Sequence, residues 1–581
     1  MASPGTPAYP AADRSDLVED LHGRPVADPY RWLESSDDDR TRDWVQAQRH
    51  LMDAERAQWT MRDRFVDRVR ALLGAGTISP PYWRGARQFR TRREPGQQFA
   101  VLLVVEADGS ERVLIDPMAL DPSGLTTLDS WQPSKEGDRL AYQLSVGGTE
   151  ESSVFVMDVA TGDIIDGPID RCRFSPVAWL PGGEAFYYVR RIAPELLPES
   201  ERNFHRRVLL HRVGADPATD RLIFGAGMTM TNYYGVEVSR DGRWLQVSAA
   251  EGTEPRNDLW VADLHTTAPD APALQLVQGD VDAQTGLTFG RDGRVYVHTD
   301  RDAPRGRIAV ATTDALTTWV DLIAEDPEAV LDGVALLDGP ELDEDLLLVV
   351  RTRHGVGELT LHRAADGALL AEIALPGVGT VAGPVEHIDG GPLAWLVYTD
   401  HTTVPQVHEF DARTRALRLH SLPPGSVDVP AVHSRQVTYR SKDGTEVRMF
   451  IVSPTAAPDR PRPTVLYGYG GFGIPLTPGY SAAILAWVEA GGVWAIANLR
   501  GGGEEGEQWH RDGMLGRKQN VFDDFHAAAE FLVRAGWTTP AQLGVSGGSN
   551  GGLLVGAALT QRPELFNAVV CVAPLLDMIR Y

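Results

Sequence analysis

The sequence contains only two cysteines, Cys172 and Cys571, among 581 residues. Two thiols cannot build a disulfide framework or a cysteine-based zinc site, so we expect two buried free thiols in a reducing compartment. Positive charge is also scarce, because 55 lysine and arginine residues face 80 aspartate and glutamate residues and the net charge is −25. This sign repels phosphate backbones and anionic lipid, which argues against binding to nucleic acid or to a membrane surface.

Long apolar runs are absent as well. The sequence has no stretch of 18 apolar residues that would predict a membrane span. The segment Met1–Pro7 shows no signal peptide, because no basic residues are followed by an apolar run. The histidines lack the spacing of zinc peptidases, in which two histidines four positions apart enclose a glutamate. We therefore expect a cytoplasmic protein that uses neither a metal nor another cofactor.

Residues 1–75 predict a helical segment. Ser36–Asp38 can cap a first helix, and Gly74 follows a second helical pattern at the position of a C-terminal glycine. Both helices are amphipathic and so require a partner surface, which we expect to be the α/β domain at the other end of the chain.

Residues 76–430 predict a β-propeller. Short apolar strands alternate with Asp-Gly turns, as in Val238–Leu245 and Phe289–Tyr296. The units recur about every 51 residues, close to the length of a four-stranded propeller blade, which gives a count of seven blades. The units begin near Ile78, Trp131, Phe174, Val236, Leu287, Leu336 and Val385.

Residues 431–581 alternate strands and helices, which predicts a mostly parallel sheet covered on both faces. A hairpin comes first, two buried strands follow, and a helix precedes the short strand at Gln542–Val545. The earlier segments are Gln436–Tyr439 and Arg448–Val452 for the hairpin, Thr464–Tyr467 and Val493–Ala497 for the strands, and Phe522–Val533 for the helix.

A glycine cluster follows that short strand. Gly547-x-Ser549-x-Gly551 matches the nucleophile elbow, a tight strand-to-helix turn that exposes a serine hydroxyl above the sheet. Ser546 fits the same pattern, and a glycine-rich turn without chemistry is a third interpretation. We favour Ser549, because a helix can begin directly after it while Ser546 still belongs to the strand.

A second glycine cluster, Gly468–Gly473, fits the G-x-G-x-x-G pattern of dinucleotide-binding proteins. That pattern needs a helix immediately afterwards to receive the pyrophosphate. Pro475 and Pro478 intervene, and no helical pattern begins before Ser481. We therefore interpret the segment as a loop of a hydrolase that supplies an oxyanion donor.

Taken together, these segments resemble the prolyl oligopeptidase family of serine peptidases, and the resemblance covers nearly the whole chain. It implies an α/β-hydrolase domain with an inserted seven-bladed β-propeller, and cleavage of short peptides after proline. The matching segments are Asp28–Glu34, Leu466–Phe472, Asn498–Glu504, Lys518–Asp524 and Gly547–Gly552, with a weaker match at Asn203–Arg207.

The resemblance also implies roles for single residues. Ser549 would form the acyl-enzyme, the backbone N–H of Asn550 and the hydroxyl of Tyr469 would donate to the oxyanion, and Phe472 would line the pocket for the proline ring. Tyr469 as a buried tyrosine with a satisfied hydroxyl, and Phe472 as a plain core residue, are the alternatives.

The sequence contains no candidate for the triad histidine or for the acid that orients it. On this fold they follow the serine in the chain, and no histidine follows Ser549. Asp577 and Glu564 lie too early in the fold to be the acid, and we assign His510 a structural role. The sequence therefore predicts a C-terminally truncated enzyme that is inactive alone, has a raw sheet edge, and could be completed by a second chain.

Two other functions compete with this one. The chain could be a non-catalytic propeller that binds a ligand beside a relict hydrolase portion, or a sister peptidase or esterase of the same clan. The intact elbow at Ser549 and the intact loop at Tyr469 argue against a relict, because a strained serine has no structural use.

Overall fold

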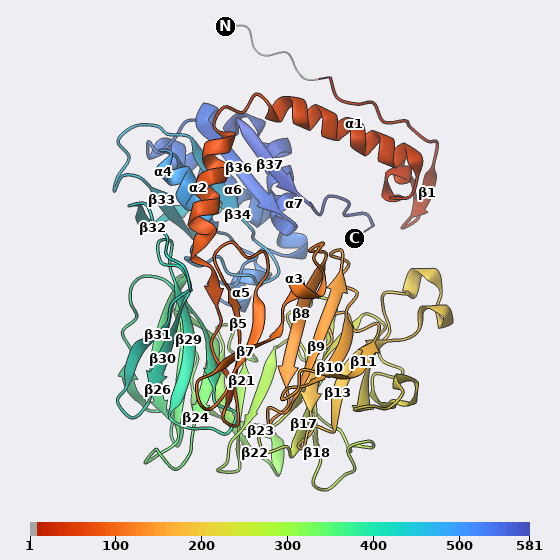
Figure 1. Cartoon of the computed structure of the whole chain (residues 1–581). Helices are drawn as coiled ribbons and strands as arrows, with labels where there is room; N and C mark the ends of the chain where they lie inside the picture. Colours follow the sequence, from red (N-terminus) through yellow and green to blue (C-terminus); the bar gives the residue numbers. More distant parts are fainter. Residues whose placement is uncertain (1–7, 581) are drawn as a thin grey trace.

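The computed structural model describes residues 8–580. An α/β sheet with its helices lies on one end of a ring of small sheets (Figure 1). The segment Met1–Pro7, which carries the expectation about a signal peptide, and Tyr581 are outside the described residues. Within residues 8–580, no helix has both the length and the apolar character needed to cross a bilayer.

The N-terminal part forms the expected two helices, α1 (Asp39–Arg56) and α2 (Arg62–Leu72), after a hairpin of β1 (Val18–Leu21) and β2 (Arg24–Ala27). Asp38 caps α1 by accepting a hydrogen bond from the Arg40 N–H. α2 packs on α4 (Ala482–Glu489) of the α/β part, whereas α1 has a single buried residue. The helix-ending glycine differs from the expectation, because Gly76 and not Gly74 takes the positive φ, at +71°.

The ring contains seven sheets built from strands that are consecutive in sequence, six of four strands and one of five. The seven predicted unit starts fall in the first strand of each sheet, except that Phe174 lies three residues before it. The predicted Asp-Gly turns are present, and Gly242 and Gly293 take the positive φ that such turns need, at +77° and +78°. The predicted seven-bladed propeller is confirmed.

The strands of the seven blades have the following bounds, in chain order: β3 (Thr77–Ile78), β4 (Tyr82–Arg84), β5 (Arg87–Arg93), β6 (Val101–Val105), β7 (Glu111–Ile115); β8 (Thr126–Pro133), β9 (Arg139–Val146), β10 (Ser153–Asp158), β11 (Ile164–Ile169); β12 (Val177–Trp179), β13 (Ala185–Arg191), β14 (Arg206–Arg212), β15 (Arg221–Phe224); β16 (Asn232–Val238), β17 (Trp244–Glu251), β18 (Asp258–Asp263), β19 (Gln275–Gln278); β20 (Thr285–Phe289), β21 (Arg294–Thr299), β22 (Arg307–Thr312), β23 (Ala315–Ile323); β24 (Ala329–Leu337), β25 (Leu346–Arg353), β26 (Val356–Arg363), β27 (Leu369–Glu372); β28 (Thr380–Glu386), β29 (Leu393–Thr399), β30 (Gln406–Asp411), β31 (Ala416–Ser421). A short helix, α3 (Pro117–Leu120), follows the first blade.

The α/β part holds one six-stranded sheet in the order β32-β33-β35-β34-β36-β37. The hairpin strands pair antiparallel, and β35, β34, β36 and β37 run parallel, as the alternation of strands and helices predicts. The strands are β32 (His433–Arg440), β33 (Glu446–Ser453), β34 (Thr464–Gly468), β35 (Val493–Asn498), β36 (Leu543–Gly548) and β37 (Ala568–Val572).

Three further helices complete this part, α5 (Glu507–Arg511), α6 (Gln519–Arg534) and α7 (Asn550–Gln561). The predicted helix Phe522–Val533 lies within α6, and its apolar face is in the main core, with Phe525, Ala529 and Leu532 at 0% exposure and Phe522 partly buried. Because α6 and α7 pack together beside β36, this core fixes where the strand ends and α7 begins.

A cavity of about 1030 Å³ lies between the propeller and the α/β part. Inner strands of the propeller line most of it, and Gly473, Gly503, Glu507 and His510 line it from the α/β side. The N–H of Glu507 donates to the carbonyl oxygen of Pro304, which joins the two parts at the cavity wall.

Candidate active site

Ser549 lies between the end of β36 and the first residue of α7. Its φ is +56° and its ψ is −121°. A non-glycine residue adopts such a backbone only where the surroundings enforce it, and strain of this kind is found at functional sites. The residue is exposed, and among residues 8–580 its hydroxyl makes no hydrogen bond, so it is free to meet a substrate.

The glycines around Ser549 are required by close backbone contacts. A β-carbon on Gly547 would lie 2.1 Å from the carbonyl oxygen of Gly551, and one on Gly552 would lie 2.7 Å from the Cα of Pro574. Neither contact can relax, because the opposing atoms are backbone. The turn therefore accepts no side chain at these positions, of which Gly547 belongs to the elbow pattern; a β-carbon on Gly551, its other glycine, would lie 2.9 Å from the carbonyl oxygen of Gly468.

Ser546, the alternative nucleophile, occupies a different environment. It is an interior residue of β36, in register with Tyr467 on one side and Val570 on the other. Its backbone is that of an ordinary strand and not of a strained turn. The geometry favours Ser549.

The loop Gly468–Gly473 runs beside the elbow. Tyr469 is half-buried, and a β-carbon on Gly551 would lie 3.6 Å from its Cδ2, so the phenol side chain is next to the start of α7. No hydrogen bond of the Tyr469 hydroxyl is formed within the described residues. Phe472 takes a φ of +56° and is 36% exposed. The residue that lines the large cavity is its neighbour Gly473.

Two polar contacts tie this loop to the elbow. The carboxamide Nδ2 of Asn550 donates to the carbonyl oxygen of Tyr469 at 2.5 Å, and Nζ of Lys518 donates to the carbonyl oxygen of Gly470 at 2.7 Å and to Oδ1 of Asn550 at 2.9 Å. The backbone N–H of Asn550 begins α7 and has no acceptor within the helix, so it can serve an external anion. The sequence motif contained Lys518, but sequence reasoning assigned it no role.

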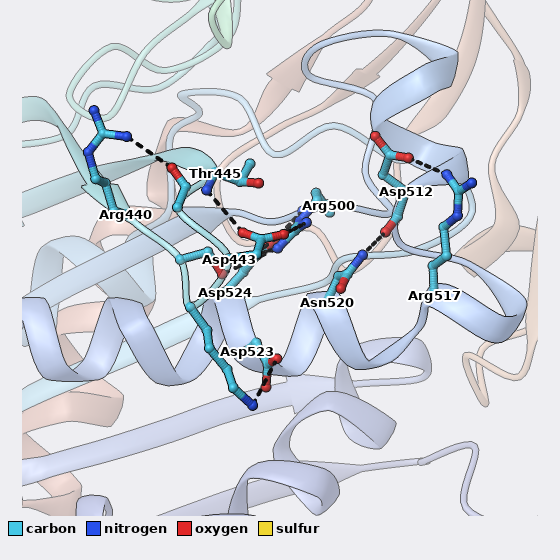
Figure 2. Close-up of polar contacts among 12 residues, drawn as sticks. Arg440, Asp443, Thr445, Arg500, Asp512, Arg517, Asn520, Asp523 and Asp524 are labelled. Atoms are coloured by element: carbon cyan, nitrogen blue, oxygen red, sulfur yellow. Dashed lines mark hydrogen bonds and ion pairs between the residues drawn. The ribbon is translucent and has the colours of Figure 1, made fainter.

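Arg500 forms ion pairs with Asp524, which is buried, and with Asp443 (Figure 2). The guanidinium of Arg500 contacts both carboxylate oxygens of Asp524 and lies 2.6 Å from Oδ2 of Asp443. Burial alone would lower the pKa of Arg500, but these hydrogen bonds raise it, so the charge is held. A β-carbon on Gly470 would lie 3.2 Å from the carbonyl oxygen of Arg500, so the ion pair positions a segment in contact with the loop.

No histidine among the described residues hydrogen-bonds to Ser549. His510 is buried, and its Nδ1 lies 3.2 Å from both carboxylate oxygens of Glu507, a contact within α5 that fits the structural role assigned to it. His526 is buried on α6. Within residues 8–580, no three His, Cys, Asp or Glu side chains are grouped so that they could hold a metal ion.

Among the strands of the described residues, β37 lies at the edge of the sheet and pairs with β36 alone. Val570 and Val572 of this strand are 54% and 55% exposed, and Leu576, Met578 and Ile579 beyond it are also exposed. The raw edge and exposed apolar surface that the sequence predicted are therefore present. Cys571 is exposed on the same strand, which differs from the expected burial, whereas Cys172 is buried.

Comparison with known families identifies the group to which this architecture belongs. A sequence model of the prolyl oligopeptidase N-terminal β-propeller domain matches residues 9–420, and one of the prolyl oligopeptidase family matches residues 478–581. The chain belongs to the prolyl oligopeptidase family. It is thus a member of a family of serine-type hydrolases, and the predicted combination of an α/β-hydrolase domain with a β-propeller is confirmed.

Individual prolyl oligopeptidases are similar over almost the whole chain. The prolyl endopeptidase of Elizabethkingia meningoseptica is 32% identical, over 99% of this chain and 80% of the relative. A solved structure from a study of two prolyl endopeptidases superposes with a TM-score of 0.91 at 34% identity, over 99% of this chain and 83% of its own. Prolyl oligopeptidase B of Galerina marginata, bound to a 35-residue substrate, gives 0.90 at 26% identity, over 98% and 83%.

Proposed function

We propose that this polypeptide carries the nucleophile and the oxyanion hole of a serine endopeptidase that cleaves short peptides after proline. Ser549 attacks the carbonyl carbon of the proline residue, and the bond to the next residue breaks so that the C-terminal fragment leaves as a free amine. The N-terminal fragment is held as an acyl-enzyme until water releases it. The observation that carries this proposal is the strained backbone of Ser549, at φ +56°, on a turn directly followed by a helix.

The oxyanion of the tetrahedral intermediate receives two donors in this proposal. One is the N–H of Asn550, helped by the dipole of α7, and the other is the hydroxyl of Tyr469. This assignment is supported by the absence, within the described residues, of a hydrogen-bond acceptor for either donor. Loss of one such donor lowers kcat by about 10²- to 10³-fold.

Phe472 is proposed to contact the proline ring of the substrate, since its exposed phenyl ring on the loop offers the flat apolar surface that a pyrrolidine prefers. Its exposure, 36%, leaves the ring accessible from outside. The large cavity beside Gly473 gives a peptide room to approach from the propeller side.

The general base and its carboxylate are proposed to lie outside residues 1–581. No histidine follows Ser549 in the sequence, and none of the upstream histidines in the described part contacts it. We therefore expect residues 1–581 alone to hydrolyse peptides only slowly, because an oxyanion hole without the base keeps a residual acceleration of about 10³- to 10⁴-fold over water. A second polypeptide that pairs with β37 and supplies a histidine would restore the activity.

Labelling with a fluorophosphonate probe tests the nucleophile. We expect the active protein, as isolated from its natural source, to be labelled at Ser549 and to cleave a Gly-Pro chromogenic substrate in preference to a Gly-Arg one. Ser549→Ala should abolish both, and Ser546→Ala should abolish neither. Labelling at Ser546, or a preference for arginine, would overturn the proposal, and residues 1–581 alone should label far more slowly.

A further inference from the structure

Lys518 stands immediately before α6, in the segment Lys518–Asp524 that the proposed chemistry does not use. Its side chain is half-buried, and its Nζ donates to the carbonyl oxygen of Gly470 and to Oδ1 of Asn550. Within the described residues it forms no ion pair with a carboxylate. The structure therefore holds a lysine beside the elbow whose partners are two neutral oxygens.

The two acceptors belong to the two halves of the proposed oxyanion hole. Gly470 directly follows Tyr469 in the loop, and Asn550 directly follows Ser549 in the elbow. Asn550 in turn donates from Nδ2 to the carbonyl oxygen of Tyr469. A continuous set of three hydrogen bonds thus joins the ammonium, the start of α7 and the backbone on both sides of the Tyr469–Gly470 peptide.

The loop has few side chains of its own that could anchor it, so these hydrogen bonds contribute to its position. A β-carbon on Gly470, whose φ is +62°, would lie 2.3 Å from Cγ1 of Val521, and one on Gly471 would lie 2.5 Å from Nδ2 of Asn550. Two glycines at such close contacts carry no side chains that could anchor the loop. The Tyr469 and Gly470 carbonyls are held by the polar contacts of Asn550 and Lys518, and the far end of the loop by the Gly473 N–H, which donates to the carbonyl oxygen of Gly501.

The choice of lysine is informative in this chain. Lys518 is one of three lysines, with Lys135 and Lys442, in a sequence that otherwise uses arginine for positive charge. An ammonium is compact and can donate in three directions from one atom, whereas a guanidinium is planar and needs more room. The carbonyl oxygen of Gly470 and Oδ1 of Asn550 both accept from one nitrogen atom, which an ammonium can provide in less space than a guanidinium.

We propose that Lys518 is a positioning residue for the oxyanion hole, fixing the Tyr469 loop against the start of α7 and adding an uncompensated positive charge beside the developing oxyanion. This inference rests on the proposed function. Charge that is already in place before the reaction needs no reorganisation when the oxyanion forms, which is how such sites lower the barrier. Burial lowers the pKa of Lys518 to about 8, which reflects how incompletely the surroundings compensate this charge.

The kinetic test compares Lys518→Met with Lys442→Met, each introduced in the natural source so that the active protein is isolated. Lys442 is 79% exposed and lies 3.7 Å from Asp523 of the same helix α6, so its replacement makes the same chemical change away from the loop. We expect Lys518→Met to lower kcat for a Gly-Pro substrate about 10- to 100-fold with KM changed less than about threefold, because misplaced catalytic donors act on the transition state. Lys442→Met should match the wild type.

Hydrogen exchange gives a second readout that needs no turnover. We expect the amides of residues 470–474 to exchange faster in Lys518→Met and not in Lys442→Met. Lys518→Arg, which keeps the charge, should lie between the wild type and Lys518→Met in kcat, and it replaces the methionine variant if that one fails to fold.

Unchanged kcat together with unchanged exchange in Lys518→Met would overturn the inference, and so would a fall in kcat that only follows the fraction of unfolded protein. Wild-type protein isolated from its natural source that cleaves no Gly-Pro substrate would instead refute the proposed function. In that case faster exchange in Lys518→Met would still support the tie between loop and helix, and unchanged exchange would refute it.

Discussion

The side-chain amide of Asn550 donates a hydrogen bond of 2.5 Å to the backbone carbonyl oxygen of Tyr469. Asn550 therefore has two functions in the proposed site, since its backbone N–H faces the oxyanion and its side chain holds the loop that bears the other donor. A substitution of Asn550 keeps the backbone N–H, but it removes the side-chain hydrogen bond that holds the loop, so we expect it to lower activity.

Asn550→Ala tests this division of roles. We expect kcat to fall about 10- to 100-fold while KM changes little, because the phenol of Tyr469 loses its fixed position. Stability should fall by about 1–3 kcal/mol, since the Tyr469 carbonyl and the Lys518 ammonium each lose a buried partner. Steady-state kinetics on a Gly-Pro substrate and calorimetry measure the two effects.

Asn520→Ala is the matched control. The Nδ2 of Asn520 also donates to a backbone carbonyl oxygen, that of Asp512 at 2.9 Å, in the same part of the chain but away from the loop (Figure 2). A comparable loss of stability with kcat unchanged is expected. Equal losses of kcat in the two variants would show that a general loosening, and not the loop contact, is responsible.

Tyr469→Phe separates the oxyanion donor from packing. Because the Tyr469 hydroxyl has no hydrogen-bond partner within the described residues, its removal should leave the melting temperature within about 1 °C of the wild type. The value of kcat should fall about 10²- to 10³-fold, as for the loss of one oxyanion donor. A loss of stability without a loss of kcat would assign the phenol a structural role instead.

Gly547→Ala and Gly548→Ala probe the elbow. The new β-carbon of the first would lie 2.1 Å from the carbonyl oxygen of Gly551, whereas that of the second would lie 3.5 Å from the carbonyl oxygen of Val572. We expect the first to destabilise the protein by several kcal/mol, in the range of severe backbone clashes, and the second by less than about 1 kcal/mol. Thermal unfolding decides, and equal effects would show that the turn is more plastic than the structure indicates.

The sequence was sufficient for the repeat architecture and for the elbow, because both are local patterns. Both the Asp-Gly turns and the order of strand, Ser549 and helix depend on residues that are neighbours in the sequence. The contacts that support the loop were not predictable in this way, since Lys518 and Asn550 are 32 positions apart and meet only through the packing of α6 on α7. Gly76, not Gly74, ends the N-terminal helical segment because a short 3₁₀ turn extends α2, which propensity does not encode.

The Arg500–Asp524 pair should be among the most sensitive polar contacts in the α/β part. Both side chains are almost fully buried, at 5% and 0% exposure. Asp524→Asn removes the buried charge and leaves the Arg500 guanidinium paired only with Asp443, which is half-exposed, so we expect a loss of about 3–5 kcal/mol. Calorimetric unfolding of the variant gives the value.

Asp443→Asn is the comparison for this pair. Asp443 contacts the same guanidinium but is 48% exposed. Burial by itself would raise its pKa, and the hydrogen bonds from Arg500 and Thr445 instead hold the pKa at about 2. Because water screens this side chain, we expect a loss below about 1 kcal/mol. A loss as large as that of Asp524→Asn would contradict the assignment of Asp524 as the main partner.

Glu504 gives the chain a pH-dependent stability that a single substitution should remove. Its side chain is 3% exposed and accepts hydrogen bonds on Oε1 from the Leu476 N–H and from Nδ2 of Asn498, while Oε2 is buried and has no partner within residues 8–580. Burial raises its pKa from 4.5 to about 7. The carboxyl group therefore keeps its proton in the folded protein at pH values where the unfolded chain has lost it.

The direction of the effect follows from proton binding. Between pH 4.5 and about 7 the folded state binds more protons at Glu504 than the unfolded state, so its contribution to stability falls as the pH rises and becomes constant above about 7. Glu504→Gln stays neutral in both states. The free energy of unfolding of Glu504→Gln relative to that of the wild type should therefore rise from pH 4.5 to 7, by about 1.4 kcal/mol for each unit of pKa shift. The difference between the two melting temperatures should grow over the same range. A temperature difference that is the same at pH 5 and pH 8 would mean that the carboxyl group is ionised in the folded protein, with its unpartnered oxygen satisfied by a group other than a proton.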